Sequence, residues 1–127
     1  MKIVFITGVS GTMGSEALKQ IAQTGAFRSR VLLRPKKANI KLAKKLQKNE
    51  NIEVLFGDIQ NYEDCLAGVK DADYVLHCAA IIPPAADHNH DEAFRTNWLG
   101  TQNLLNAVVE SGQTEKTKFV YIGTVAE

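Results

Sequence analysis

Three glycines spaced three residues apart, Gly8, Gly11 and Gly14, constrain the fold of this chain more than any other feature. They follow an apolar run, residues 2–7, that is typical of a buried strand, and they precede residues 15–24, which have helical periodicity. A helix that begins directly after a glycine turn points its unpaired first-turn N–H groups, and the positive end of its dipole, at one place. That arrangement suits the binding of a phosphate group.

Each glycine would have a separate role in such a turn. Gly8 would allow the sharp turn, Gly11 would leave room for a pyrophosphate to approach the backbone, and Gly14 would let the helix pack close to the strand. Glycines also close many ordinary turns, so this spacing by itself is a weak signal. A predicted strand before the glycines and a predicted helix after them supply the context that a dinucleotide-binding turn requires.

Apolar runs rich in β-branched residues alternate with helical patterns along the whole chain. The predicted strands are residues 2–7, 30–34, 52–56, 74–78 and 118–122, and the predicted helices are residues 13–24, 38–48, 62–69 and 91–111. We therefore expect one α/β domain over residues 1–127. Its architecture would be a three-layer, Rossmann-type, doubly wound parallel sheet with strand order 3-2-1-4-5.

Local signals mark where several of these helices begin, end and face. Asn61 is placed to cap the third helix, and Gly25 and Gly112 stand where helices should end. In the fourth helix a set of residues recurs at helical spacing and should face the sheet, namely Phe94, Trp98, Thr101, Leu105 and Val108.

Ligands of such a sheet bind at the carboxyl ends of its strands, where the strand order reverses. The second strand ends at Arg34, at a position where an acidic residue would favour the ribose of NAD(H). A guanidinium can instead contact phosphate oxygens through two N–H groups, and Lys36 and Lys37 add positive charge. NADP(H) is therefore favoured, with NAD(H) as the second choice. The alternative is that Arg34 only begins a solvated loop.

Asp58 follows the third strand and a glycine. Its carboxylate could accept a hydrogen bond from an adenine amino group, or it could form the turn or cap the next helix. The local sequence leaves both interpretations open.

Charge and composition exclude several other classes of function. The net charge is +1, although nine of the fifteen basic residues lie between residues 28 and 48. Most of these lysines would form a solvated helix face, and no aromatic platform accompanies them, so nucleic-acid binding is not expected. Cys65 and Cys78 have no metal-ligand spacing, and no apolar run is long enough to span a membrane. We expect reduced thiols and a cytoplasmic protein.

Residues 87–92, which alternate histidine with carboxylate and amide residues, raise the question of a metal site. Asn89 or Asp91 can instead cap the helix that follows, and acidic residues suit its positive end. We favour capping and predict no metal. His77, at the end of a buried strand, is expected to be a packed, hydrogen-bonded residue and not a base.

Five segments together resemble the extended branch of the short-chain dehydrogenase/reductase superfamily. Residues 7–14 resemble its T-G-x-x-G-x-x-G loop, and residues 57–59 its adenine-side acidic motif. The other three matches are residues 77–80 to its H-x-A-A segment, residues 97–105 to its N-x-x-G-T-x-N-L-L helix, and residues 119–124 to its fifth strand. The match covers essentially the whole chain.

The resemblance implies roles for particular residues. The glycine loop would bind the pyrophosphate, Asp58 and Ile59 would flank the adenine, and Thr124 would hydrogen-bond the substrate oxygen that is oxidised or reduced. The implied cofactor-binding residues are Gly8, Ser10, Gly11, Thr12, Met13, Gly14, Arg34, Asp58, Ile59, Ala79, Ala80 and Asn97. Ala79 and Ala80 would run beside the nicotinamide ribose, and Asn97 would help to position that end of the cofactor.

The family's proton-donating tyrosine, in a Y-x-x-x-K motif, has no counterpart, because none of Tyr62, Tyr74 and Tyr121 is followed four residues later by lysine. We expect these residues to be the cofactor-binding part of a longer oxidoreductase, epimerase or dehydratase acting on a small molecule, and to have no turnover alone. The alternative is a non-catalytic NADP(H)-binding sensor. Relatives often pair through the helix that resembles residues 91–111, which leaves a homodimer open.

Overall fold

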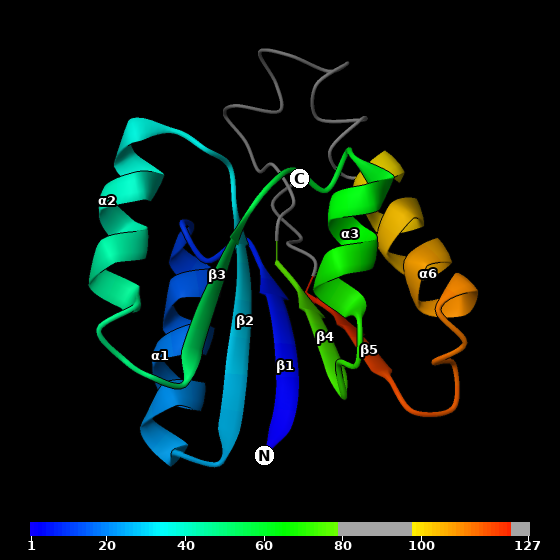
Figure 1. Cartoon of the computed structure of the whole chain (residues 1–127), viewed down its shortest axis with the longest axis horizontal. Coiled ribbons are helices and arrows are strands. Elements are labelled where there is room, and N and C mark those ends of the chain that lie inside the picture. Colours follow the sequence, from blue (N-terminus) through cyan, green and yellow to red (C-terminus); the bar gives the residue numbers. More distant parts are fainter. Residues whose placement is uncertain (79–97, 123–127) are drawn as a thin grey trace.

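A computed structural model describes residues 1–78 and 98–122. Its five strands are parallel and form one sheet in the order β3-β2-β1-β4-β5, as the sequence predicts (Figure 1). They are β1 (Lys2–Thr7), β2 (Phe27–Leu33), β3 (Ile52–Phe56), β4 (Tyr74–His77) and β5 (Lys118–Tyr121). The order of strands reverses between β1 and β4, so the carboxyl ends of these two strands flank the place where such sheets bind ligands.

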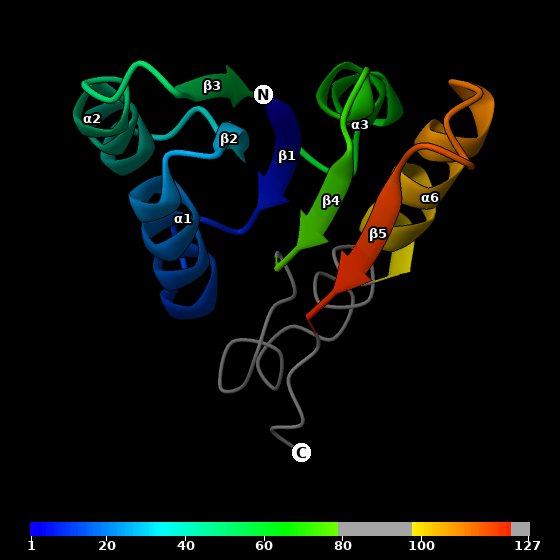
Figure 2. The ribbon, with the colours of Figure 1, turned by 90° about the horizontal axis from the view of Figure 1, so that it is seen from below.

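Helices cover both faces of the sheet, which makes three layers (Figure 2). The helices α1 (Thr12–Thr24) and α2 (Lys37–Leu46) lie on one face, and α3 (Tyr62–Val69) and α6 (Gly100–Glu110) lie on the other. Successive residues of β1 point to opposite faces: Phe5 belongs to the core beneath α3 and α6, and Val4 and Ile6 belong to the core beneath α1 and α2. This two-sided burial explains why the central strands are continuous apolar runs.

The helix ends agree with the sequence predictions. The Asn61 side chain accepts a hydrogen bond from the Glu63 N–H at 3.0 Å, which caps α3. Gly25 and Gly112 follow the last turns of α1 and α6 with φ of 67° and 73°. Cys65 and Cys78 are free thiols. None of the helices in the described parts of the chain has the length and apolar character needed to cross a bilayer.

The second strand begins earlier than predicted, at Phe27 and not at Arg30, and it ends at Leu33, before Arg34. Its first residues pair with β1, since Phe27 lies opposite Lys2 and Arg28 opposite Ile3. The sequence Phe-Arg-Ser-Arg is too polar to indicate a buried strand. These residues form a strand because their backbone pairs with β1, and their side-chain pattern does not indicate this.

The buried face of α6 also differs from the prediction. Gly100, Leu104, Ala107 and Val108 are buried, whereas Trp98 and Leu105 are 54% and 39% exposed. The prediction was right for Val108 and wrong for Trp98 and Leu105; Phe94 lies outside the described residues. Apolar residues occur on two sides of this helix, and only contact with α3 and the sheet selects the side that is buried.

Candidate functional site

The glycine loop has the geometry that its spacing predicts. Gly8 has φ of 79°, a conformation that favours glycine, and its carbonyl accepts a hydrogen bond from the Gly11 N–H at 3.0 Å. A Cβ atom at Gly14 would lie 1.9 Å from the Gly8 oxygen, so α1 can pack this closely only because residue 14 has no side chain. The turn at Gly8 and the close packing at Gly14 are confirmed. The pyrophosphate contact at Gly11 stays a prediction.

The first turn of α1 has no side-chain cap within the described residues. Gly11 is the N-cap residue, and the first turn contains no acidic residue. Ser10, Thr12 and Met13 are exposed, while Val9 is buried and anchors the loop. By helix geometry the first N–H groups have no partner within the helix, so this end has the donors that a phosphate accepts from.

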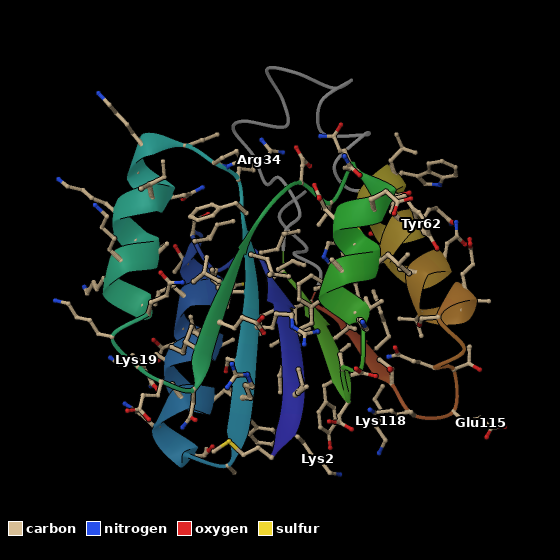
Figure 3. All side chains as sticks on the ribbon, viewed as in Figure 1. Lys2, Lys19, Arg34, Tyr62, Glu115 and Lys118 are labelled. Carbon is tan, nitrogen blue, oxygen red and sulfur yellow. The ribbon has the colours of Figure 1, made fainter. Side chains whose placement is uncertain are left out.

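A cavity of about 210 Å³ lies beside this loop, at the carboxyl ends of β1, β2 and β3. It brings together five of the predicted residues: Gly8, Ser10, Arg34, Asp58 and Ile59. The remaining lining residues are Thr7, Leu32, Leu33, Lys36, Asn39 and Gly57. Figure 3 shows Arg34 at this end of the sheet, between α2 and α3.

Arg34 and Asp58, predicted for different parts of the cofactor, approach each other. Arg34 Nε lies 3.5 Å from Asp58 Oδ2, with the side chains 35% and 38% exposed. Asp58 Oδ1 also accepts from the Gln60 N–H at 2.9 Å, and the Asp58 N–H donates to Asp64 Oδ2 at 3.0 Å. The turn-forming interpretation of Asp58 is therefore confirmed, and its contact with adenine stays a prediction.

Ile59 lines the cavity and belongs to the core as well. Ile59 is 5% exposed, and its Cδ1 lies so close to Gly100 that a Cβ atom there would be only 2.3 Å from it. Its carbonyl accepts hydrogen bonds from Asn103 Nδ2 at 2.9 Å and from the Cys65 thiol at 3.3 Å. The floor of the cavity is thus tied to α3 and α6.

Asn39 is a site residue that sequence reasoning missed. It lines the cavity from the first turn of α2, and its Nδ2 donates to the Arg34 carbonyl at 2.9 Å. An amide side chain in the first turn, where it can reach back to the preceding loop, was the available signal.

His77 joins β1, β4 and α6 next to the glycine loop. It is 1% exposed; its Nδ1 lies 2.7 Å from Thr7 Oγ1 and its Nε2 lies 3.1 Å from Thr101 Oγ1. Thr7 Oγ1 also accepts from the Cys78 N–H at 3.1 Å. Burial lowers the pKa of His77 to about 4, so the ring is neutral near pH 7. The prediction of a packed, hydrogen-bonded histidine is confirmed.

Four predicted site residues, Ala79, Ala80, Asn97 and Thr124, lie outside the described residues, as does the segment 87–92. Their proposed roles stay predictions.

Comparison with known proteins identifies the family. Residues 4–125 match the family described as "Polysaccharide biosynthesis protein". The chain belongs to this family. The match covers the glycine loop, the cavity and the five strands except Lys2 and Ile3 of β1, and the predicted membership of the extended short-chain dehydrogenases/reductases is confirmed.

Individual relatives are similar over nearly the whole chain. An uncharacterized membrane protein of Methanocaldococcus jannaschii is 31% identical, and a UDP-glucose 4-epimerase of Rickettsia rickettsii is 28% identical; each match covers 97% of this chain and 36% of the relative. The solved structure of Pen from Bacillus thuringiensis is 33% identical with a TM-score of 0.80, covering 94% of this chain and 36% of that one. The chain thus spans about a third of the length of these relatives.

Substituting Gly14 tests the close packing between α1 and the Gly8 carbonyl. Gly14→Ala should lower the free energy of unfolding by about 3 kcal/mol or more, because its Cβ meets backbone that cannot rotate away. Gly11→Ala is the matched control: its Cβ would lie 3.4 Å from the Gly8 oxygen, so it should cost at most about 1 kcal/mol, the difference between alanine and glycine as N-cap. Equal losses in urea denaturation would contradict this account.

Stability should depend on pH through His77. Its pKa is about 4 in the folded chain and 6.5 in the unfolded chain, so below pH 6.5 the unfolded state takes up a proton that the folded state does not. The free energy of unfolding should fall between pH 6.5 and pH 4, by up to about 3 kcal/mol, and this contribution should level off at lower pH. Urea denaturation of wild type and His77→Asn over this range checks it; equal slopes would show that His77 is not responsible.

Proposed function

We propose that this chain binds a nicotinamide dinucleotide, with the pyrophosphate at the N-terminus of α1 and the adenosine in the cavity. The observation that carries the proposal is that cavity, which joins Gly8 and Ser10 to Arg34 and Asp58 at the ends of three parallel strands. Membership of the extended short-chain dehydrogenases/reductases supports it. The cofactor, when bound, supplies a nicotinamide ring that accepts or donates hydride.

The residues present fit the adenosine and pyrophosphate parts of such a cofactor. The uncapped first turn of α1 has N–H donors for phosphate, and the absence of acidic residues there removes a source of repulsion. The cavity wall combines apolar Leu32 and Ile59 with the charged Arg34 and Asp58. Apolar groups can contact the faces of an adenine, and the polar groups can orient its edge and the ribose.

NADP(H) is the cofactor that we favour over NAD(H). Arg34 and Lys36 line the cavity just after β2, where the ribose of the adenosine is expected. A guanidinium and an ammonium together favour a ribose that has a 2′-phosphate.

For the whole protein we propose hydride transfer at a carbinol or carbonyl carbon, as in an oxidoreductase, epimerase or dehydratase. The Rickettsia relatives named UDP-glucose 4-epimerase support a sugar-nucleotide substrate. Thr124 would hydrogen-bond the reacting oxygen, because a hydroxyl can act as donor or acceptor without titrating. Ala79, Ala80 and Asn97 would contact the nicotinamide end.

Titration with NADP(H) and NAD(H) tests the cofactor proposal. We expect tighter binding of NADP(H), and a loss of roughly tenfold in its affinity on Arg34→Gln, the value of about one charge-assisted hydrogen bond. Affinity for NAD(H) should change by less than about threefold. Arg28→Gln is the control; Arg28 is exposed on β2, away from the cavity, and its substitution should change neither affinity. Tighter binding of NAD(H) by the wild type would overturn the argument from Arg34.

We also propose that two copies pair through the outer face of α6. Leu105 and Val109, one turn apart, are 39% and 60% exposed, and Trp98 just before the helix is 54% exposed. Figure 1 shows α6 at one side of the molecule, with this helix outermost. Large apolar side chains gathered on one exposed helix face are typical of a subunit interface.

Analytical ultracentrifugation tests this pairing. The wild type should sediment as a dimer, and Val109→Lys should sediment as a monomer because a lysine cannot be buried there without a partner. Ile40→Lys is the matched control, since Ile40 is 44% exposed on α2 and should leave the dimer intact. A monomeric wild type, or equal effects of the two substitutions, would contradict the interface.

A further inference from the structure

We propose that Asp58 is a positioning residue for Arg34, so that selectivity for the 2′-phosphate depends on both residues. The inference rests on the proposed cofactor site and adds a residue that determines specificity. Asp58 would act on both cofactors through any contact with adenine, but on NADP(H) alone through the guanidinium that it holds.

The sheet places the two residues side by side. The strands β2 and β3 are parallel, with Leu33 opposite Phe56, and the Gly57 N–H extends the pairing by donating to the Leu33 carbonyl at 2.9 Å. Arg34 directly follows Leu33 in the sequence, and Asp58 directly follows Gly57. Their contact is therefore set by the register of two paired strands, β2 and the edge strand β3, and not by the chance meeting of two loops.

Other hydrogen bonds hold the Asp58 side chain and the backbone of both residues in place. Asp58 Oδ1 accepts from the Gln60 N–H, and the Asp58 N–H donates to Asp64. The Arg34 carbonyl accepts from the Lys36 N–H at 2.8 Å and from Asn39 Nδ2. These bonds fix the Asp58 carboxylate and the origin of the Arg34 side chain, and the contact between them holds the guanidinium on the side of β3.

The contact is made through Nε, the guanidinium nitrogen nearest to the side-chain stem, at 3.5 Å from Asp58 Oδ2. The two terminal nitrogens form the fork that phosphate oxygens accept from. A carboxylate at Nε restricts rotation of the whole planar group, so less freedom is lost when the fork meets a phosphate. Because both side chains are more than a third exposed, the pair itself adds little to stability. Orientation is the effect that this geometry can produce.

Positioning and simple charge make opposite predictions for Asp58→Asn. If Asp58 mattered only as a negative charge near the phosphate, its removal would raise the preference for NADP(H). If Asp58 holds the guanidinium, its removal lowers that preference. Comparing the two cofactors cancels any contact with adenine, which NAD(H) and NADP(H) share.

The experiment measures the ratio of Kd for NAD(H) to Kd for NADP(H) in wild type, Asp58→Asn, Arg34→Gln and the double variant. We expect Asp58→Asn to lower the ratio by about threefold, the scale of a partly exposed ion pair, and to have no effect in the Arg34→Gln background. Glu53→Gln is the matched control. It removes a carboxylate from the same two strands, where Glu53 pairs with Arg30 at 3.0 Å outside the cavity, and should leave the ratio unchanged.

A ratio that rises or stays constant in Asp58→Asn, while Arg34→Gln lowers it, would overturn the positioning role and leave the NADP(H) proposal intact. A ratio that Arg34→Gln does not change would overturn both. Circular dichroism establishes that each variant is folded. Asp58→Ser, which keeps an oxygen able to accept from the Gln60 N–H, replaces Asp58→Asn if the latter does not fold, with the same two outcomes deciding.

Discussion

The approach of α1 to the Gly8 carbonyl is the contact on which the rest of the site depends. A side chain at residue 14 would place its Cβ 1.9 Å from that oxygen, so the helix would have to move away from β1. With the helix in place, its first turn and the Gly8 turn meet at the end of β1, beside the cavity. The absence of one methyl group thus sets where the donors of the helix point.

Parallel pairing then brings distant residues to that same end of the sheet. Arg34, Asp58 and His77 follow or end three different strands, and each lies near the carboxyl end because all strands run the same way. Arg34 and Asp58 line the cavity, whereas His77 is buried between Thr7 and Thr101 and ties β1 to α6. The parallel topology therefore places Arg34 and Asp58 in the cavity wall and places His77 in the interior, where it connects β1 to α6.

Much of this was predictable from local patterns. Continuous apolar runs identified the strands, Asn61 identified the start of α3, and the glycine spacing identified the turn. The beginning of β2 was missed because the charged residues Arg28 and Arg30 do not fit the apolar pattern of a buried strand. Their backbone nevertheless pairs with β1. The buried face of α6 was misassigned because Trp98, Leu105 and Val109 are as apolar as the residues that pack inward. Hydrophobic periodicity cannot distinguish a core face from a second apolar face.

The sequence by itself determined the α/β class, the strand order and the location of the glycine turn, since these depend on periodicity, glycine spacing and the handedness of parallel crossovers. Only the tertiary structure decided which side chains meet. Arg34 and Asp58 are separated by a helix and a strand in the chain, and their contact arises from the register of β2 against β3. The same holds for His77, which is kept neutral by burial that no local pattern reveals.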